Sequence, residues 1–247
     1  MNILIVESEN DQYFIEALAK KVSDENQVCR IDEYKYSSLD EKKLTTQITN
    51  ALIDVKSRQV SKIGIILDMD NSTQEERIAL INKCLKKSFA DCTYPEPSHL
   101  LTNIKELITN PIDDDLDVKM ACFFTNIDGE GELETVLKAI KLKKSVFADC
   151  LYEGWKDCLI NKGKTIGKKG EQCDISDKEL LKLWVDFYKR FDTLKRNNRD
   201  EKNTDWKGIM RGETKKGEKI KTVRGEYIFD LHSEKLKDIK SFLSLFD

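Results

Sequence analysis

Two aspartates follow an apolar segment early in the chain. Residues 63–67 read Ile-Gly-Ile-Ile-Leu, and Asp68 and Asp70 come directly after them with one residue between the two. A short, unbroken apolar run is typical of a strand that is covered on both faces in a parallel sheet. Two carboxylates this close repel each other unless a positive charge lies beside them, and a divalent cation often supplies it. The pair is therefore a candidate metal site.

The segments around this pair alternate between strand-like and helix-like patterns. The apolar spacing predicts strands over residues 2–6, 27–34, 62–70 and 117–126, and helices over 10–22, 38–58, 74–88 and 131–143. We interpret the proline-containing stretch 94–111 as a loop that holds a short helix. Four strand-helix alternations indicate an α/β fold with a four-stranded, mainly parallel sheet that is flanked by helices.

Acidic residues follow three of these predicted strands. Glu7 follows the first strand, the Asp68–Asp70 pair ends the third, and Asp128 follows the fourth. Ligand sites in such sheets lie beyond the carboxyl ends of the strands. We therefore expect acids that are far apart in the sequence to converge at one edge of the sheet.

The C-terminal hundred residues are predicted to be mostly helical, which gives a core at residues 1–142 and a basic helical region at 143–247 that packs on it. The stretch 195–224 holds eleven Lys and Arg against five Asp and Glu, which makes it a candidate nucleic-acid contact. The last segment, 228–246, is predicted to be a helix that packs back onto the core.

Composition excludes several classes of protein. The net charge is −3 over 247 residues, and no apolar run approaches the roughly 20 residues that span a bilayer. The start has no basic segment or cleavage site typical of a signal peptide. Seven irregularly spaced cysteines and two histidines do not fit a Cys/His zinc site. We expect a cytoplasmic protein whose cysteines are reduced, small buried hydrophobic residues.

Two known patterns match only in part. The opening ILIVESEND resembles a response-regulator receiver domain, but Ser8 separates Glu7 from Glu9, and Asp54, near the place of the phosphorylated residue, lies in a helical pattern. The segment LDMDNST resembles the first motif of haloacid dehalogenase-type phosphatases, with Asp68 as nucleophile. That motif normally heads the first strand, and it would leave Glu7 without a role.

The Toprim family accounts for more of the acids. The chain resembles this family, which is shared by topoisomerases, bacterial primases and the overcoming-lysogenization-defect nucleases, over residues 1–142 and the last twenty. The matching elements are Glu7 in VESENDQYF, with Asp11 as its last acid, and the D-x-D of Asp68 and Asp70. Ser8 stands where small Toprim-like bacterial proteins usually have glycine.

A later segment extends the resemblance. TNIDGEGELETVL is similar to the later acidic segment of those proteins, with Asp128 as the acid at the strand end and Glu134 as the glutamate of its G-x-LE element. The closing YIFDLHSEKLKDIKSFL looks like the last helix of the same group.

The resemblance implies a nuclease that depends on Mg²⁺ or Mn²⁺. Asp68 and Asp70 would hold one ion, with Glu7, Asp11 and Asp128 or Glu134 available around a second. Glu7 would also serve as general base or acid. Lysines in the Gly/Lys-rich stretch are predicted to stabilise the phosphate charge: Lys164, Lys168 and Lys169.

The same resemblance leaves the biological role open. It implies a phage-defence or toxin-like effector that acts on DNA or RNA, as a monomer or an oligomer, with a separately encoded ATPase as a regulatory partner. The alternative is a non-catalytic Toprim-like module that binds a metal or a partner protein. A dehalogenase-type phosphatase is the third hypothesis.

Overall fold

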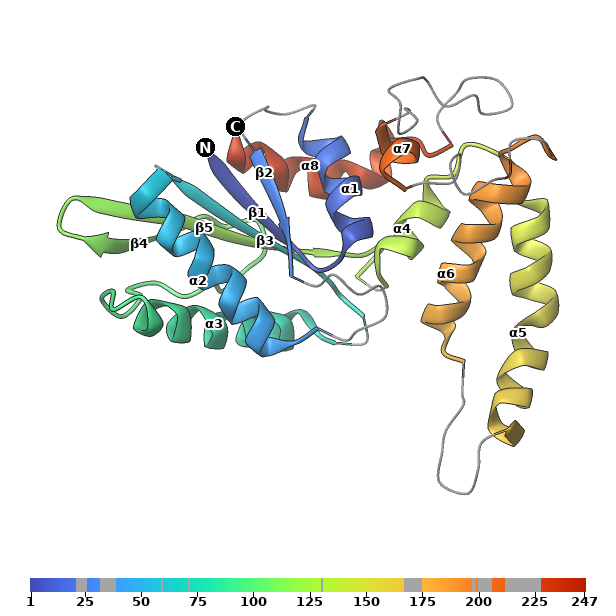
Figure 1. Cartoon of the computed structure of the whole chain (residues 1–247), viewed down its shortest axis with the longest axis horizontal. Coiled ribbons are helices and arrows are strands. Elements are labelled where there is room, and N and C mark those ends of the chain that lie inside the picture. The colour runs from blue at the N-terminus through green and yellow to red at the C-terminus, as the bar shows by residue number, and fades with distance from the viewer. Residues whose placement is uncertain are drawn as a thin grey trace. The chain divides into compact units, whose positions relative to one another are not determined.

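The computed structural model describes residues 1–20, 26–31, 39–58, 60–70, 72–129, 131–166, 175–196, 199, 206–211 and 228–247. These residues form two compact units. The first comprises Met1–Leu133 and Ser233–Asp247, and the second comprises Glu134–His232. Figure 1 shows the elements of both units, and each unit is described here by itself.

The first unit is built on a five-stranded sheet. Its strands are β1 (Asn2–Val6), β2 (Asn26–Arg30), β3 (Lys62–Asp68), β4 (Ile108–Asp113) and β5 (Leu116–Thr125), in the order β2-β1-β3-β5-β4. The first four strands in this order pair in parallel, and β4 alone is antiparallel to its neighbour β5. The predicted α/β class and the mainly parallel sheet are therefore confirmed, with five strands instead of four.

The additional strand, β4, begins inside the stretch 94–111 that the sequence suggested was a loop and ends two residues beyond it. Its Ile108, Asn110 and Ile112 are buried while the residues between them are more exposed. Pro111 cannot donate a ladder hydrogen bond, but an edge strand has one unpaired side and tolerates it. The Asn110 side chain accepts the His99 backbone N–H at 2.8 Å and donates to the His99 carbonyl at 3.0 Å. Asp114 and Asp115 form the turn of the β4–β5 hairpin.

Helices cover both faces of the sheet (Figure 1). On one face lie α2 (Glu41–Arg58) and α3 (Gln74–Asp91), and on the other lie α1 (Glu9–Ala19) and α8 (Lys237–Leu243). A capping box starts α3, because Thr73 and Glu76 each accept the other's backbone N–H. These side chains satisfy N–H groups that would otherwise lack a partner at the helix start.

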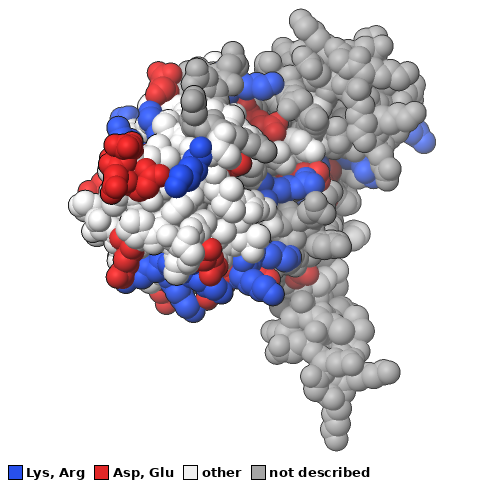
Figure 2. Space-filling model, turned by 60° about the vertical axis from the view of Figure 1, so that its left-hand side comes forward, with Lys and Arg blue, Asp and Glu red and all other residues white. Residues whose placement is uncertain are grey.

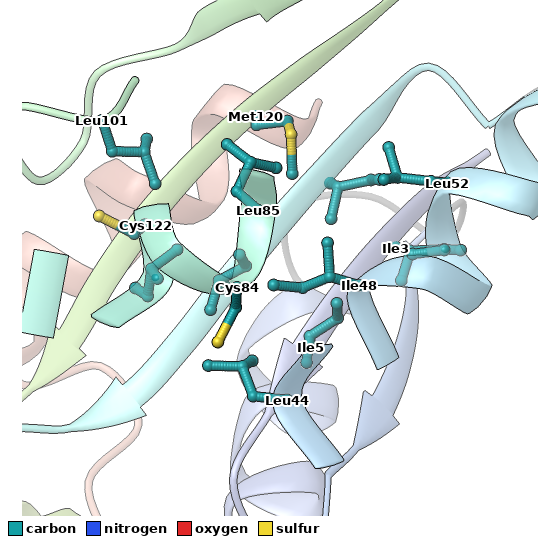
Figure 3. Packing of buried hydrophobic residues seen from close by; sticks show 14 of the residues in the cluster. Ile3, Ile5, Leu44, Ile48, Leu52, Cys84, Leu85, Leu101, Met120 and Cys122 are labelled. Atoms are coloured by element: carbon teal, nitrogen blue, oxygen red, sulfur yellow. The ribbon is translucent and has the colours of Figure 1, made fainter. Parts of the chain in front are cut away.

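The main hydrophobic core lies between the sheet and the α2–α3 layer. Figure 3 shows side chains of β1, α2, α3 and β5 pointing toward one another. The labelled residues of these elements that are 2% exposed or less include Ile3, Ile5, Leu44, Ile48, Leu52, Cys84, Leu85, Met120 and Cys122. Burial raises the pKa of the Cys122 thiol to about 12, so this cysteine is a neutral, small apolar residue.

The C-terminal residues pack against the opposite face of the sheet. The rings of Phe123 in β5 and Phe242 in α8 lie 5.5 Å apart, and Phe246 is fully buried. The Asn2 side chain donates to the Phe246 carbonyl at 2.7 Å, and Lys62 donates to the Leu245 carbonyl at 2.7 Å. The prediction that the closing helix packs onto the core is thus confirmed.

The second unit is mostly helical, as predicted. It contains α4 (Leu133–Ala139, whose first residue belongs to the first unit), α5 (Val146–Ile166), α6 (Asp177–Phe187), a π-helical turn (Tyr188–Asp192) and α7 (Trp206–Arg211). The fully buried rings of Trp184 and Tyr188 stack 5.2 Å apart. They form the core of this unit.

An acidic side chain contacts this aromatic core. Asp149 accepts hydrogen bonds from Trp184 Nε1 at 2.8 Å and from Ser145 Oγ at 2.5 Å. Burial alone would raise the pKa of Asp149, but these hydrogen bonds and the charge of Lys141 outweigh it and hold the pKa below the ordinary aspartate value. Cys150 and Cys158 in α5 are exposed, so the expectation of buried cysteines is wrong for these two. None of the described helices is long and apolar enough to cross a membrane.

Candidate metal centre

The acidic residues of interest lie where the direction of the chain's crossovers changes. From β1 the chain passes through α1 to β2, at one edge of the sheet. From β3 it continues toward the opposite edge, where β5 and β4 lie. β1 and β3 are adjacent and parallel, with Val6 opposite Ile66. A crevice beyond the carboxyl ends of two such strands is the usual ligand site of an open α/β sheet.

Glu7 and Asp68 meet at this position. Glu7 is the first residue after β1 and Asp68 is the last residue of β3, and both are buried. The backbone N–H of Asp68 donates to Glu7 Oε2 at 3.3 Å. Asp68 Oδ1 accepts the backbone N–H of Leu133 at 3.1 Å. The predicted approach of these two acids, which are 61 residues apart in the chain, is therefore present.

Asp70 is placed by an unusual backbone conformation. Its φ angle is 51°, in the left-handed region, which aspartate and asparagine tolerate better than most residues. The conformation is held by a bridge to Gly131, whose carbonyl accepts the Asp70 N–H at 3.0 Å. Gly131 itself has a φ of 97°, where a side chain would be strained. The bridge thus joins the loop after β3 to the loop before α4.

This junction brings a third acid to the pair. Carboxylate oxygens of Asp68, Asp70 and Glu132 lie within 4.8 Å of one another. Asp68 and Glu132 are buried, and Asp70 is partly exposed. Oxygen ligands in this arrangement fit a hard divalent cation. The cluster could therefore hold a metal ion.

The sequence did not single out Glu132. The family resemblance pointed to Glu134, two residues further along GELE, as the glutamate of this segment. Glu132 precedes α4 and follows Gly131, so its position depends on the loop that pairs with Asp70. Glu134 is buried, and it is the first residue of the second unit. The sequence did contain a signal for Glu132. It lies between a glycine and the start of a helix, shortly after a strand.

The remaining predicted site residues are not among the three acids of this cluster. Asp11 is buried, and its carboxylate accepts the Ser8 backbone N–H at 2.9 Å as part of the capping box of α1. Asp128 is exposed, with a φ of 53°. Lys164 lies in α5, but its side chain is outside the described part of the structure, as are Lys168 and Lys169 altogether.

One cation contacts the cluster within the described residues. The Nη2 atom of Arg77, in the second turn of α3, donates to Asp70 Oδ2 at 2.6 Å, and the arginine side chain is 7% exposed. A buried ion pair of this kind offsets part of the repulsion between neighbouring carboxylates.

Comparison with known proteins gives a family but no activity. A family model described as "Protein of unknown function (DUF3226)" matches residues 1–246. The chain belongs to this family. The match to DUF3226 spans both units and includes every residue of the acidic cluster. No curated protein and no solved structure matches the chain. The function of this DUF3226 protein is therefore inferred from the cluster itself.

Proposed function

We propose that the chain is a metal-dependent nuclease with a Toprim-like core, in which Asp68, Asp70 and Glu132 hold Mg²⁺ or Mn²⁺. The observation that carries the proposal is the convergence of these three carboxylates, within 4.8 Å of one another, beyond the carboxyl end of β3. The carboxyl edges of open α/β sheets bind ligands. Glu7 lies against the same edge through its hydrogen bond with the Asp68 backbone.

The chemistry of the donor set favours a hard cation. All three donors are carboxylates, which suit Mg²⁺ and Mn²⁺ better than soft metals. When bound at such a site, a divalent ion polarises a phosphoryl oxygen and lowers the pKa of a bound water. The chain's own residues orient this chemistry, because Asp68 and Asp70 are fixed by backbone hydrogen bonds to Leu133 and Gly131.

Glu7 is the proposed proton acceptor. It is buried next to Asp68, follows a different strand and is not part of the three-acid cluster. A carboxylate in this position can accept a proton from an attacking water and return it to the leaving oxygen.

One feature supports the Toprim-like interpretation, and a second is compatible with it. A glutamate after β1 and a D-x-D at the end of the adjacent parallel strand β3 reproduce the order expected from the resemblance. Ser8, which replaces the usual glycine, has a φ of −128° and caps α1. This position therefore makes no demand for the left-handed backbone that favours glycine, and the serine does not argue against the resemblance.

A phosphodiester of DNA or RNA is the proposed substrate. On the face drawn in Figure 2, acidic and basic side chains of the described residues are intermixed around a broad uncharged area. Much of the basic stretch 195–224 lies outside the described residues, and its contact with nucleic acid stays a prediction. The defence role and the separately encoded ATPase partner stay predictions as well.

A cleavage assay tests the proposal. Plasmid, single-stranded DNA and RNA are incubated with the protein in Mg²⁺, in Mn²⁺ or in EDTA. Asp68→Asn and Glu132→Gln should each lower the cleavage rate at least about a hundredfold, since they remove charged ligands of the ion. Asp114→Asn, in the exposed β4–β5 turn, is the control and should cut like the wild type. Equal cleavage by all four proteins would refute the proposal.

The ion pair between Arg77 and Asp70 favours a second candidate function. Because Arg77 already engages one oxygen of Asp70 at 2.6 Å, the cluster also suits a metal-binding module without catalysis. In that case Mn²⁺ would raise the melting temperature, and no polynucleotide would be cut under any of the conditions above.

A further inference from the structure

Arg77 is a buried cation in a place that neither the helix nor the core favours. It is 6% exposed, and arginine is rarely buried to this extent unless it is paired. It also lies in the second turn of α3, four residues after the N-cap Thr73. A positive charge near a helix N-terminus opposes the helix dipole. Its position therefore depends on the carboxylates beside it.

The contacts of Arg77 are few for a guanidinium. Nη2 donates to Asp70 Oδ2 at 2.6 Å and is 3.5 Å from the Met69 carbonyl oxygen. Nε is buried and makes no hydrogen bond with any described residue. A guanidinium has five N–H donors, and a buried donor without an acceptor costs free energy. Among the described residues, the charged hydrogen bond to Asp70 is therefore the main contact that holds this side chain.

We propose that Arg77 is a resident counter-cation of the acidic cluster and that it weakens the binding of a divalent ion there. The inference rests on the metal site of the proposed function. Without an ion, Arg77 offsets the repulsion among Asp68, Asp70 and Glu132 and keeps the cluster together. With an ion bound, two positive charges share Asp70, so Arg77 lowers the affinity for the ion.

The expected effect follows from the separation of the charges. The guanidinium contacts Asp70, and the proposed ion contacts the same carboxylate, so the two charges lie only several ångströms apart. Even at an effective dielectric constant of about 20, a unit charge at such a distance from a divalent ion changes its binding constant by a factor of ten or more. Removal of this one charge should therefore tighten metal binding by at least about tenfold.

The test compares three variants with the wild type in Mn²⁺ titrations followed by electron paramagnetic resonance of the free ion. Arg77→Met removes the charge and keeps an apolar stem, and Arg77→Lys keeps the charge. Lys83→Met is the matched control, because Lys83 lies on the same helix in a pair with Glu41 at 2.8 Å and its side chain is 68% exposed.

We expect Arg77→Met to bind Mn²⁺ at least about tenfold more tightly than the wild type. It should also melt at a lower temperature without metal, because Asp70 has then lost the charge of Arg77. Mn²⁺ should raise its melting temperature more than that of the wild type, because the variant binds the ion more tightly. Arg77→Lys and Lys83→Met should bind within about threefold of the wild type, since each keeps a positive charge beside the cluster.

The outcomes separate this inference from the proposed function. The role of Arg77 is refuted, and the metal site stands, if the wild type binds Mn²⁺ and a folded Arg77→Met binds it no more tightly. The same conclusion follows if Lys83→Met gains as much affinity for Mn²⁺ as Arg77→Met does. If no protein in the series binds Mn²⁺, both proposals fail. If Arg77→Met is unfolded without metal, recovery of its native circular dichroism in Mn²⁺ supports the inference, and no recovery refutes it.

Discussion

The close packing at Gly64 yields a prediction about the support beneath the acidic cluster. Gly64 lies in β3, the strand that ends at Asp68. A Cβ atom at Gly64 would lie 2.7 Å from Leu4 Cδ2 and 2.8 Å from Phe246 Cζ. Both neighbours are fully buried, so neither can move away into solvent. Glycine here allows the C-terminal residues to pack directly against the sheet.

Substitution of this glycine by alanine should therefore destabilise the first unit. Overpacking of a filled core costs about 1–3 kcal/mol, while replacement of glycine in a strand returns roughly 0.5–1 kcal/mol of chain entropy. With values near the middle of each range, the net loss in the free energy of unfolding is about 1–2 kcal/mol. For a protein of this size such a loss lowers the melting temperature by roughly 2–8 °C.

Thermal unfolding followed by circular dichroism measures this change, and the chain offers a matched control. Gly154 lies in α5, and a Cβ atom added there would have no neighbour within 4 Å. Gly154→Ala should leave the melting temperature unchanged or raise it, because alanine favours a helix over glycine by about 1 kcal/mol. The two substitutions are chemically identical, so a difference between them reports the space around each glycine.

A double-mutant cycle identifies the contact that is responsible. Phe246→Leu shortens the side chain that approaches Gly64, and it should recover at least about 0.5 kcal/mol of the loss in Gly64→Ala. If Gly64→Ala melts at the wild-type temperature, or if its loss is simply additive with that of Phe246→Leu, the packing described for the C-terminal residues is wrong.

Three further predictions concern single side chains. Asp70→Ala should be about 1 kcal/mol less stable than Asp70→Asn without metal, because asparagine tolerates the left-handed backbone better; equal denaturation midpoints would contradict this. Asn110→Ala should cost about 1–3 kcal/mol in denaturant unfolding, since it removes the two hydrogen bonds between this buried side chain and the backbone of His99, and a loss below about 0.5 kcal/mol would count against those bonds. Asp149, whose pKa is lowered in the folded protein, stabilises it at neutral pH. This contribution is lost as the pH falls below about 4, so Asp149→Asn should differ from the wild type at pH 7 and converge with it in acid; a constant difference would refute the assignment.

The strands and helices that the sequence predicted well have strong periodic patterns. The apolar runs of β1 and β3 are buried on both faces, and α2 and α3 each present one apolar side to the sheet. The edge strand β4 was missed because Pro111 and the surrounding polar residues are typical of loops, and only pairing with β5 makes an extended segment favourable there. The sequence pattern within a segment does not show which strand that segment will pair with.

The acidic cluster shows the same division between local and long-range information. The sequence predicted that Glu7 and Asp68 would meet, because both end strands of a parallel sheet and such ends share one edge. It could not select Glu132 over Glu134, because that choice depends on the bridge between Asp70 and Gly131 and on the left-handed backbone at both residues. Strand ends thus determine which acids approach one another, while the strained loops determine which carboxylates complete the site.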